Sequence, residues 1–455
     1  MIKILRRYAV VLILAATAVA AEPRELSSHH FYSDFKLSGF SDMAPLGDER
    51  YEASEGLVRL GIRYNRLMWE DWLLDADLRA IFSCRELFGS NEIDCGLSAE
   101  IKRLYLRGEN LFESPFLAAD IGRTRLRDQR SWLFDDDIDL IKGYYDSTLL
   151  DIGLGAARWV WNPRLDDIFD EDDNSRNDDS DSYYLFGAIE YQWHHRHFMR
   201  LQLIHESYEA PERFTFDELY ESNALSENSE LNWLVISFEG EKRYNTGRRF
   251  NYWLDLATVQ GDRNLRIEDP VTHLVSWVDQ SISGGFGLDL GLITRLSEQG
   301  HAIGVRYALG QGDPTLSGDY SGYLQPHIAS NKDRRVGDTR LRYYGDTLDP
   351  ALGNLQIVSV FAGLPLNESV WLEGAYYHYQ QMEADSWLQA GRTRLRPNGL
   401  STDIGYGLDL TLGGDLHRDI RLEGVLGVFQ GGDAFDGVAA DDTAYSARLE
   451  LKVRW

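Results

Sequence analysis

The stretch YSARLELKVRW, residues 445–455, alternates apolar and polar side chains at every position. Tyr445 and Leu449 fall on one face of an extended chain, whereas Arg448 and Lys452 fall on the other. Side chains two residues apart lie on the same face of a β-strand, so this stretch predicts a strand with one apolar and one charged face. Further segments repeat the pattern, at residues 58–65, 286–292, 303–309 and 404–412. The sequence therefore predicts an all-β fold.

Two architectures can use such strands. In a water-soluble sandwich the apolar face forms the core, whereas in an outer-membrane barrel it meets lipid and the polar face lines the lumen. Segments of about ten residues, with short connections such as 194–197 and long ones such as 313–352, favour the barrel. We expect a transmembrane antiparallel β-barrel of about 18 strands, with short periplasmic turns and long extracellular loops, wide enough for an aqueous pore.

The N-terminal segment indicates export. Residues 1–21 combine a basic start, an apolar run too short to span a bilayer comfortably, and the small residues Ala18-Val19-Ala20. This layout is typical of a cleavable signal peptide, with a retained anchor as the alternative. We therefore expect residues 22–455 to form the barrel in a bacterial outer membrane, in contact with lipids that include lipopolysaccharide.

The composition argues against nucleic-acid binding. The chain has 46 Lys and Arg against 73 Asp and Glu, a formal net charge of −27, whereas phosphate contacts need a basic surface. Many of the acids fall in residues 166–181, where we expect a solvated external loop, free or bridged by divalent ions to outer-leaflet lipids. A calcium loop of the EF-hand type is disfavoured, because Ser175 stands where that loop needs glycine.

Enzyme, cofactor and metal signatures are absent from the sequence. No G-x-S-x-G, H-E-x-x-H or P-loop pattern occurs, so we expect no catalytic residue, no enzyme activity and no cofactor. His194, His195 and His197 fall in a tight turn and favour a surface turn over a metal site. The two cysteines, Cys84 and Cys95, lack neighbouring zinc ligands, and in an oxidising compartment they favour a disulfide.

Basic residues fall on the predicted lumenal face of several strands: Arg59, Arg63, Arg123, Arg125, Arg127, Arg306, Arg421 and Arg448. Such arginines either attract anions into a pore or pair with neighbouring acids such as Glu423 and Glu450 and fill the wall. Residues two apart share a face, so a lumenal Arg123 also places the apolar Ile121 in the lumen. A β-bulge near Gly122 would return Ile121 to the outer face, and we expect one there.

A second basic cluster lies in the long connection at 331–342, with Lys332, Arg340 and Arg342 among its members. A long loop of this kind either stays in solvent or folds into the lumen and narrows it. Spacing alone leaves both possibilities open.

Several short motifs resemble, in order and spacing, the outer-membrane alginate export family: GRTRLR (122–127), FNYW (250–253), GDR (261–263), TRLR (339–342), GNLQ (353–356) and GDAF (432–435). The resemblance runs from about Lys102 to Trp455. It implies a monomeric eighteen-stranded barrel that passes an anionic polysaccharide, alginate or a similar polyuronate, through an arginine-lined constriction partly closed by loops. It also implies a periplasmic scaffold of a secretion complex as partner. A general or substrate-specific porin for small anionic solutes is the alternative.

The resemblance also implies positions for the pore residues. The matched constriction arginines are Arg125, Arg342 and Arg421, and Asp135 matches an acid that pairs with them. Other basic pore positions fall near Lys36, Arg63, Lys102 or Arg103, and Lys332. Glu423 departs from the pattern, because the family has a second arginine at that position, and an acid expected near Trp161 is missing.

Overall fold

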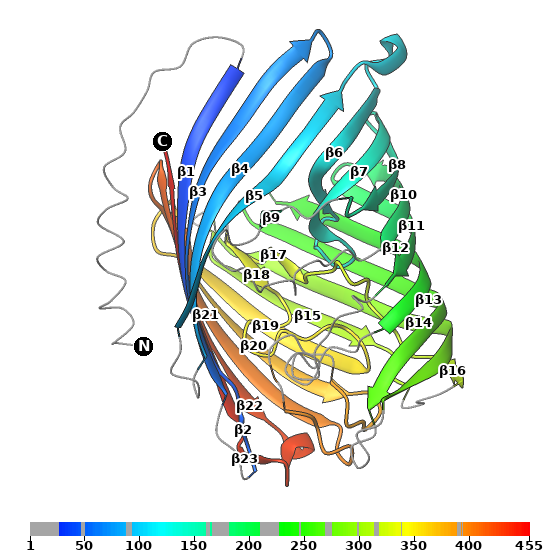
Figure 1. Ribbon diagram of the computed structural model, residues 1–455, viewed down its shortest axis with the longest axis vertical. Coiled ribbons are helices and arrows are strands. Elements are labelled where there is room, and N and C mark those ends of the chain that lie inside the picture. The colour runs from blue at the N-terminus through cyan, green and yellow to red at the C-terminus, as the bar shows by residue number, and fades with distance from the viewer. Residues whose placement is uncertain are drawn as a thin grey trace.

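A computed structural model gives the fold shown in Figure 1. It describes residues 27–46, 51–87, 93–160, 164–165, 182–209, 227–244, 247–268, 275–297, 300–313, 318–337, 339–388, 393 and 395–455. The predicted signal peptide at 1–21 and the acidic loop at 166–181 lie outside these residues.

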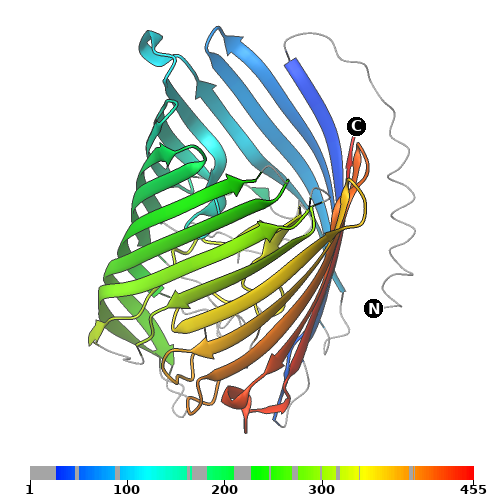
Figure 2. The ribbon, with the colours of Figure 1, turned by 180° about the vertical axis from the view of Figure 1, so that it is seen from behind.

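Eighteen antiparallel strands form a closed barrel, as the alternation predicts, and β1 pairs with β24 to complete the ring. In chain order they are β1 (Ser27–Ser41), β3 (Glu52–Trp69), β4 (Trp72–Leu87), β5 (Ile93–Gly108), β6 (Leu117–Arg127), β7 (Asp135–Asp146), β8 (Leu150–Arg158), β10 (Tyr183–His194), β11 (His197–Tyr208), β12 (Glu227–Arg243), β13 (Arg249–Glu268), β14 (Val275–Arg295), β15 (Ala302–Gly310), β19 (Leu355–Pro365), β20 (Val370–Gln381), β21 (Asp403–His417), β22 (Ile420–Gly431) and β24 (Thr443–Arg454). Figure 2 shows the unbroken far wall from the green to the orange strands.

Short accessory elements complete the described fold: strands β2 (Ala44–Pro45), β9 (Arg164–Leu165), β16 (Gly318–Tyr320), β17 (Lys332–Arg334), β18 (Arg340–Arg342) and β23 (Ala439–Asp441), and 3-10 turns η2 (Leu111–Glu113) and η4 (Asp433–Phe435). Within the described ranges, no helix has the length and apolar character needed to cross a membrane. Short turns, for example between β7 and β8, share one end of the barrel with the start of β1 and the end of β24. That end is periplasmic by the usual construction of such barrels.

The outer face of the wall is apolar. On β15, Ile303 and Val305 are 51% and 46% exposed, whereas Arg306, which follows Val305 and faces the other side, is 6% exposed. Leu408 and Leu410 on β21 are exposed in the same way, while Asp409 is buried. Exposed rows of branched apolar side chains suit hydrocarbon rather than water, so the predicted assignment of the two faces is confirmed.

The wall changes course at β6 and β7. β5 and β6 pair from Gly108 opposite Ala119 to Leu104 opposite Arg123. Beyond Arg123, up to its end at Arg127, β6 pairs with β7 alone. Beyond this point β6 and β7 curl towards the interior (Figure 1). The predicted bulge near Gly122 is wrong, because neither ladder of β6 shifts register. Instead Gly122 bends the strand at a φ of 121°, where a Cβ would approach the carbonyl oxygen of Leu104 to 2.4 Å.

Two of the described connections fold into the barrel instead of lying outside. The β6–β7 connection buries Trp132 and Leu133, and residues 320–352 bury Tyr323 and Tyr344. Rings of the two segments stack, Trp132 on Tyr323, with centroids 6.1 Å apart. These side chains join one apolar core with inward-facing residues of the far wall, among them Trp233 on β12. Of the two alternatives for 331–342, lumenal insertion is therefore the observed one.

The interior is consequently asymmetric. Lumenal side chains of β12 to β15 are buried, as for Asp255 at 2% and Asp289 at 1%. On the opposite flank, formed by β24, β1, β3 and β4, lumenal side chains stay partly exposed: Lys452 at 29%, Lys36 at 26% and Arg63 at 41%. The inserted segments therefore cover these basic side chains less completely than those of the far wall.

Cys84 and Cys95 form a disulfide that joins β4 to β5. The two residues lie opposite each other in the ladder, with their Cα atoms 4.1 Å apart. The bond therefore ties the extracellular ends of two neighbouring strands.

Candidate functional site

The first residue of β7, Asp135, is the centre of a basic cluster inside the barrel. Its side chain is 1% exposed, and its Oδ1 accepts hydrogen bonds from Nε and Nη2 of Arg125, at 2.8 and 2.5 Å. Its Oδ2 accepts from Nη2 of Arg340 at 2.9 Å and from the hydroxyl of Ser330. Arg127 lies 4.0 Å from the same carboxylate. Four residues from the sequence analysis thus meet at one point.

This arrangement holds the guanidinium groups without hiding them. The side chains of Arg125, Arg127 and Arg340 remain 31%, 31% and 25% exposed. An arginine has five N–H donors in a rigid fork, so an arginine fixed through one or two of them can still bind another carboxylate. Three cations around one buried anion leave a local excess of positive charge.

The β17–β18 hairpin carries the second half of the cluster. Lys332 lies opposite Arg342, and Arg334 lies opposite Arg340. Arg342 is 19% exposed and pairs with Asp349. Burial, together with the charges of Arg342, Arg448 and Arg340, lowers the pKa of the Lys332 ammonium to about 8, although Asp135 opposes the shift. Burial is the larger cause of this shift, and the neighbouring arginines add to it.

The other predicted basic residues of the wall mostly have an acidic partner. Lys36 contacts Glu55 at 3.3 Å, Arg63 contacts Asp75 at 2.7 Å, Arg103 contacts Asp137 at 4.0 Å, and Arg123, 1% exposed, contacts Asp139 at 3.6 Å. Lys102 lies where the register of β4 and β5 shifts. Of the two predicted roles for lumenal arginines, pairing with acids of the wall is therefore the one observed in this part of the lumen.

Arg421 is not brought to the Asp135 cluster by any contact within the described residues. It lies beside the short β21–β22 turn, where its guanidinium contacts Glu423 at 2.6 Å and Asp415 at 3.3 Å. Glu423 also accepts a hydrogen bond from Lys452 at 3.1 Å. Glu423, the departure noted in the sequence, therefore balances the charge of Arg421 locally.

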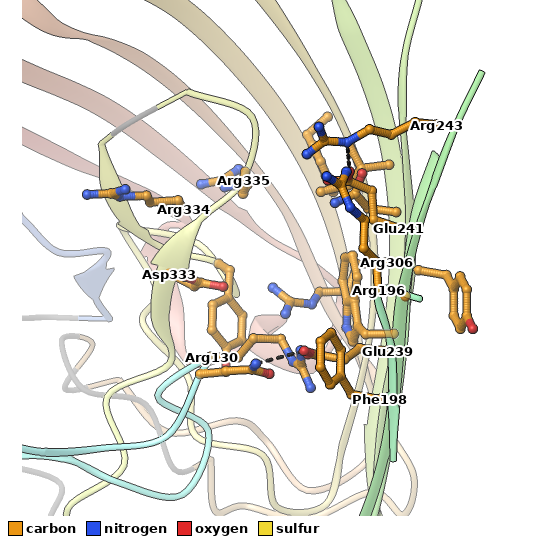
Figure 3. A pocket seen from close by; sticks show the side chains of 18 residues that line it. Arg130, Arg196, Phe198, Glu239, Glu241, Arg243, Arg306, Asp333, Arg334 and Arg335 are labelled. Carbon is orange, nitrogen blue, oxygen red and sulfur yellow. Dashed lines mark hydrogen bonds and ion pairs between the residues drawn. The ribbon is translucent and has the colours of Figure 1, made fainter. Parts of the chain in front are cut away.

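A chamber of about 560 Å³ lies between the wall and the inserted loops, towards the periplasmic ends of β11 to β14 (Figure 3). Arg196, Glu241 and Arg243 border it from the wall side, and Asp333, Arg334 and Arg335 border it from the inserted segment. Six arginines and three carboxylates line it. Three further carboxylates, Asp255, Asp289 and Asp409, pair with lining arginines, so the charges of the chamber balance.

The deep side of the chamber is fixed by ion pairs. Arg130 bridges two strands, contacting Glu239 at 2.9 Å and Asp255 at 2.6 Å. Arg306 contacts Asp289 at 3.0 Å and lies 3.7 Å from the ring centroid of Tyr343. The alternation of β15 predicted Arg306 in the lumen, whereas Arg130, Arg196 and Arg243 were not predicted. Arg130 could not be found by alternation, because it lies in an inserted loop.

The site contains no recognisable metal centre in the part of the chain that the structure describes. No group of three or more His, Cys, Asp or Glu side chains there is placed to hold an ion. The chemistry on offer is reversible pairing of guanidinium groups with anions along a passage.

Comparisons with known proteins point to one family. A family model described as alginate export matches residues 88–448. The alginate production protein AlgE of Pseudomonas aeruginosa is 27% identical over 352 residues, which cover 72% of this chain and 69% of that protein. AlgE of Pseudomonas syringae pv. tomato is 26% identical over 315 residues, covering 64% of this chain and 60% of that protein.

Solved structures show the same fold at low sequence identity. The crystal structure of Pseudomonas aeruginosa OpdQ has a TM-score of 0.55 at 9% identity, covering 94% of this chain and 99% of that one. That of OccK5 (OpdH) from the same organism has a TM-score of 0.54 at 8% identity, covering 94% and 97%. Both likenesses concern the fold alone.

Proposed function

Because the chain belongs to the alginate export family, we propose that it is a passive outer-membrane channel that exports an anionic polysaccharide, alginate or a similar polyuronate. The observation that carries the proposal is the cluster around Asp135, in which three fixed arginines keep exposed donors. Planar guanidinium groups match carboxylates, which a polyuronate presents on every sugar. A channel assignment also leaves no enzymatic role for the barrel.

In the proposed mechanism, guanidinium groups pass carboxylates along the lumen. Arg125 and Arg340 are each already shared with Asp135, so a passing carboxylate gains only part of their hydrogen-bonding capacity. Weak contacts at several sites allow release as well as capture, which conduction requires. Ions in the aqueous passage screen the attraction further.

We further propose the setting in which this channel works. A single chain closes the ring through β1 and β24, which supports a monomer as the functional unit. The exposed apolar face supports contact with outer-membrane lipids, including lipopolysaccharide. Residues 1–21 would be removed as a signal peptide, residues 22–455 would form the mature barrel, and a periplasmic scaffold would deliver the polymer.

The test is charge reversal in the cluster. Arg125→Glu with Arg342→Glu should abolish block of single-channel current by an oligouronate and abolish polymer secretion in cells. Arg66→Glu with Arg418→Glu is the matched control, because Arg418 is 87% exposed and Arg66 is also exposed. Normal secretion by a double mutant that assembles would contradict the proposed mechanism.

A porin for small anionic solutes is the second candidate. The ion pairs of Lys36 with Glu55 and of Arg63 with Asp75 favour it, because they balance charge along the wall. Such a porin would pass small organic anions and show no block by oligouronates, which the same bilayer recordings would reveal.

A further inference from the structure

Three arginines stand in one row across neighbouring strands at the periplasmic mouth. Arg243 of β12 lies directly opposite Arg249 of β13, and Arg249 lies directly opposite Arg295 of β14. Like charges opposite each other destabilise a sheet, so a row of three needs a compensating reason.

The row faces the interior of the barrel. Asn251 and Ile293 line the chamber, and they lie two residues from Arg249 and Arg295 on the same strands. Side chains two apart share a face, which places Arg249 and Arg295 on the lumenal side, one step closer to the periplasm. Arg243 lines the chamber itself (Figure 3).

Within the described residues, which leave out 245–246 and 298–299, one carboxylate contacts the row. Glu241 is shared between Arg196, at 2.5 Å, and Arg243. Arg295 donates to the backbone carbonyl of Val336 at 3.3 Å, which carries no net charge. The arginines of the chamber lining are balanced by carboxylates that line it or pair with them, so the positive charge of this mouth comes from Arg249 and Arg295. These two side chains attract anions from the periplasm.

We propose that the row of Arg243, Arg249 and Arg295, together with Arg196, is a loading site that captures the anionic polysaccharide at the periplasmic mouth. The inference rests on the proposed function and adds a binding site separate from the Asp135 cluster. Residues directly opposite on neighbouring strands lie about 5 Å apart. That spacing is comparable with the length of one sugar unit, so successive carboxylates can meet successive arginines.

The chamber behind the row fits a polymer better than a small ion. Its volume of about 560 Å³ exceeds that of a hydrated inorganic anion, and Phe198 offers an apolar ring to the C–H face of a sugar. Because the row faces the lumen, lipid headgroups of the surrounding membrane do not reach it.

The chamber lies beside the Asp135 cluster. Asp333 lines the chamber from the inserted hairpin and lies 3.5 Å from Arg127, a member of the Asp135 cluster. Arg334 and Arg335 also line the chamber from the inserted segment. The loading site therefore lies between the periplasmic mouth and the hairpin that carries half of the cluster.

The experiment is side-resolved block in planar bilayers with the full chain. Arg249→Gln with Arg295→Gln removes two charges of the row and leaves Glu241 with both of its partners. The matched control, Lys242→Gln with Arg248→Gln, removes two exposed charges, of which Lys242 lies on the outer face next to Arg243. Oligouronate is added to one side at a time, with channel orientation assigned from current asymmetry, and sulfate serves as the small-anion probe.

In Arg249→Gln with Arg295→Gln, the association rate of oligouronate block from the periplasmic side should fall about tenfold, because the electrostatic attraction that speeds association is lost. Block from the external side, and the control variant on both sides, should match the native channel. Unchanged periplasmic rates, an equal loss from both sides, or an equal loss for sulfate would each overturn the loading site. A native channel that no oligouronate blocks from either side would instead overturn the proposed function.

Discussion

The carboxylate of Asp135 accepts a hydrogen bond of 2.9 Å from Arg340, a residue 205 positions further along the chain. Asp135 begins a strand of the wall, whereas Arg340 belongs to the hairpin inserted into the lumen. The same carboxylate holds Arg125 of β6. One buried anion therefore sets the position of the inserted hairpin relative to the wall, and with it the width of the passage.

Asp135→Asn should loosen this junction. The amide keeps the shape but loses charge-assisted hydrogen bonds, each worth about 1.5–3 kcal/mol. We expect a lower unfolding temperature, noisier single-channel current and stronger selectivity for anions, because one negative charge is gone. Thermal unfolding in detergent and bilayer recordings measure these effects. Asp415→Asn is the control, since its side chain is 52% exposed, and equal effects from both variants would contradict the assigned role.

Anion selectivity should depend on pH through Lys332. With a pKa lowered to about 8, the ammonium is charged at neutral pH and loses its charge as the pH rises through that value. The ratio of anion to cation permeability should therefore fall with a midpoint near pH 8. Reversal potentials in a salt gradient measure the ratio.

In Lys332→Met, the fall of the anion-to-cation permeability ratio near pH 8 should be absent. In Lys332→Arg, the ratio should keep its neutral-pH value above pH 8, because arginine stays charged there. A step of unchanged size in the methionine variant would assign the titration to another group.

Trp233 anchors the inserted segment to the far wall. It is 1% exposed, and its indole N–H donates to the carbonyl oxygen of Leu324 at 2.8 Å. Trp233→Ala should cost about 3–5 kcal/mol and release the segment, which would raise conductance and expose residues 320–352 to protease. Trp233→Phe, which keeps most of the apolar contact, should cost about 1 kcal/mol and leave conductance near native. Native protease resistance in the alanine variant would show that other contacts suffice.

Cys84→Ser with Cys95→Ser should leave the barrel able to assemble. The disulfide closes a short loop, so its removal should cost about 3 kcal/mol or less. The measurement is the temperature at which the folded form is lost on gel electrophoresis, with reduced native protein as control. Failure of the variant to fold would mean that the bond is needed for assembly.

The sequence predicts the barrel well, because each wall strand is an amphipathic unit with its own period. Alternation in residues 303–309 correctly placed Val305 towards lipid and Arg306 inside. It failed at Gly122, where a single backbone angle redirects β6. A bend of this kind leaves no periodic trace in side-chain type, so only coordinates reveal it.

The candidate site was predictable in part. The resemblance brought Arg125 and Asp135 together, and the structure shows them in contact. The contact of Asp135 with Arg340 depends on a loop returning across the lumen, which local patterns do not encode. The row of Arg243, Arg249 and Arg295 was within reach, because cross-strand register follows from short turns, but it requires comparing strands with each other.

Because of the inserted segments, different residues determine the outer size of the barrel and the width of its lumen. Eighteen strands define the outer envelope, whereas the connections at 128–134 and 320–352 occupy the side of β12 to β15 and cover the other flank less completely. Substitutions in those two connections can thus change the width and the charge of the lumen while the lipid-facing strands stay unchanged. Barrels with such inserted connections can accept polymers of different width with the same wall strands.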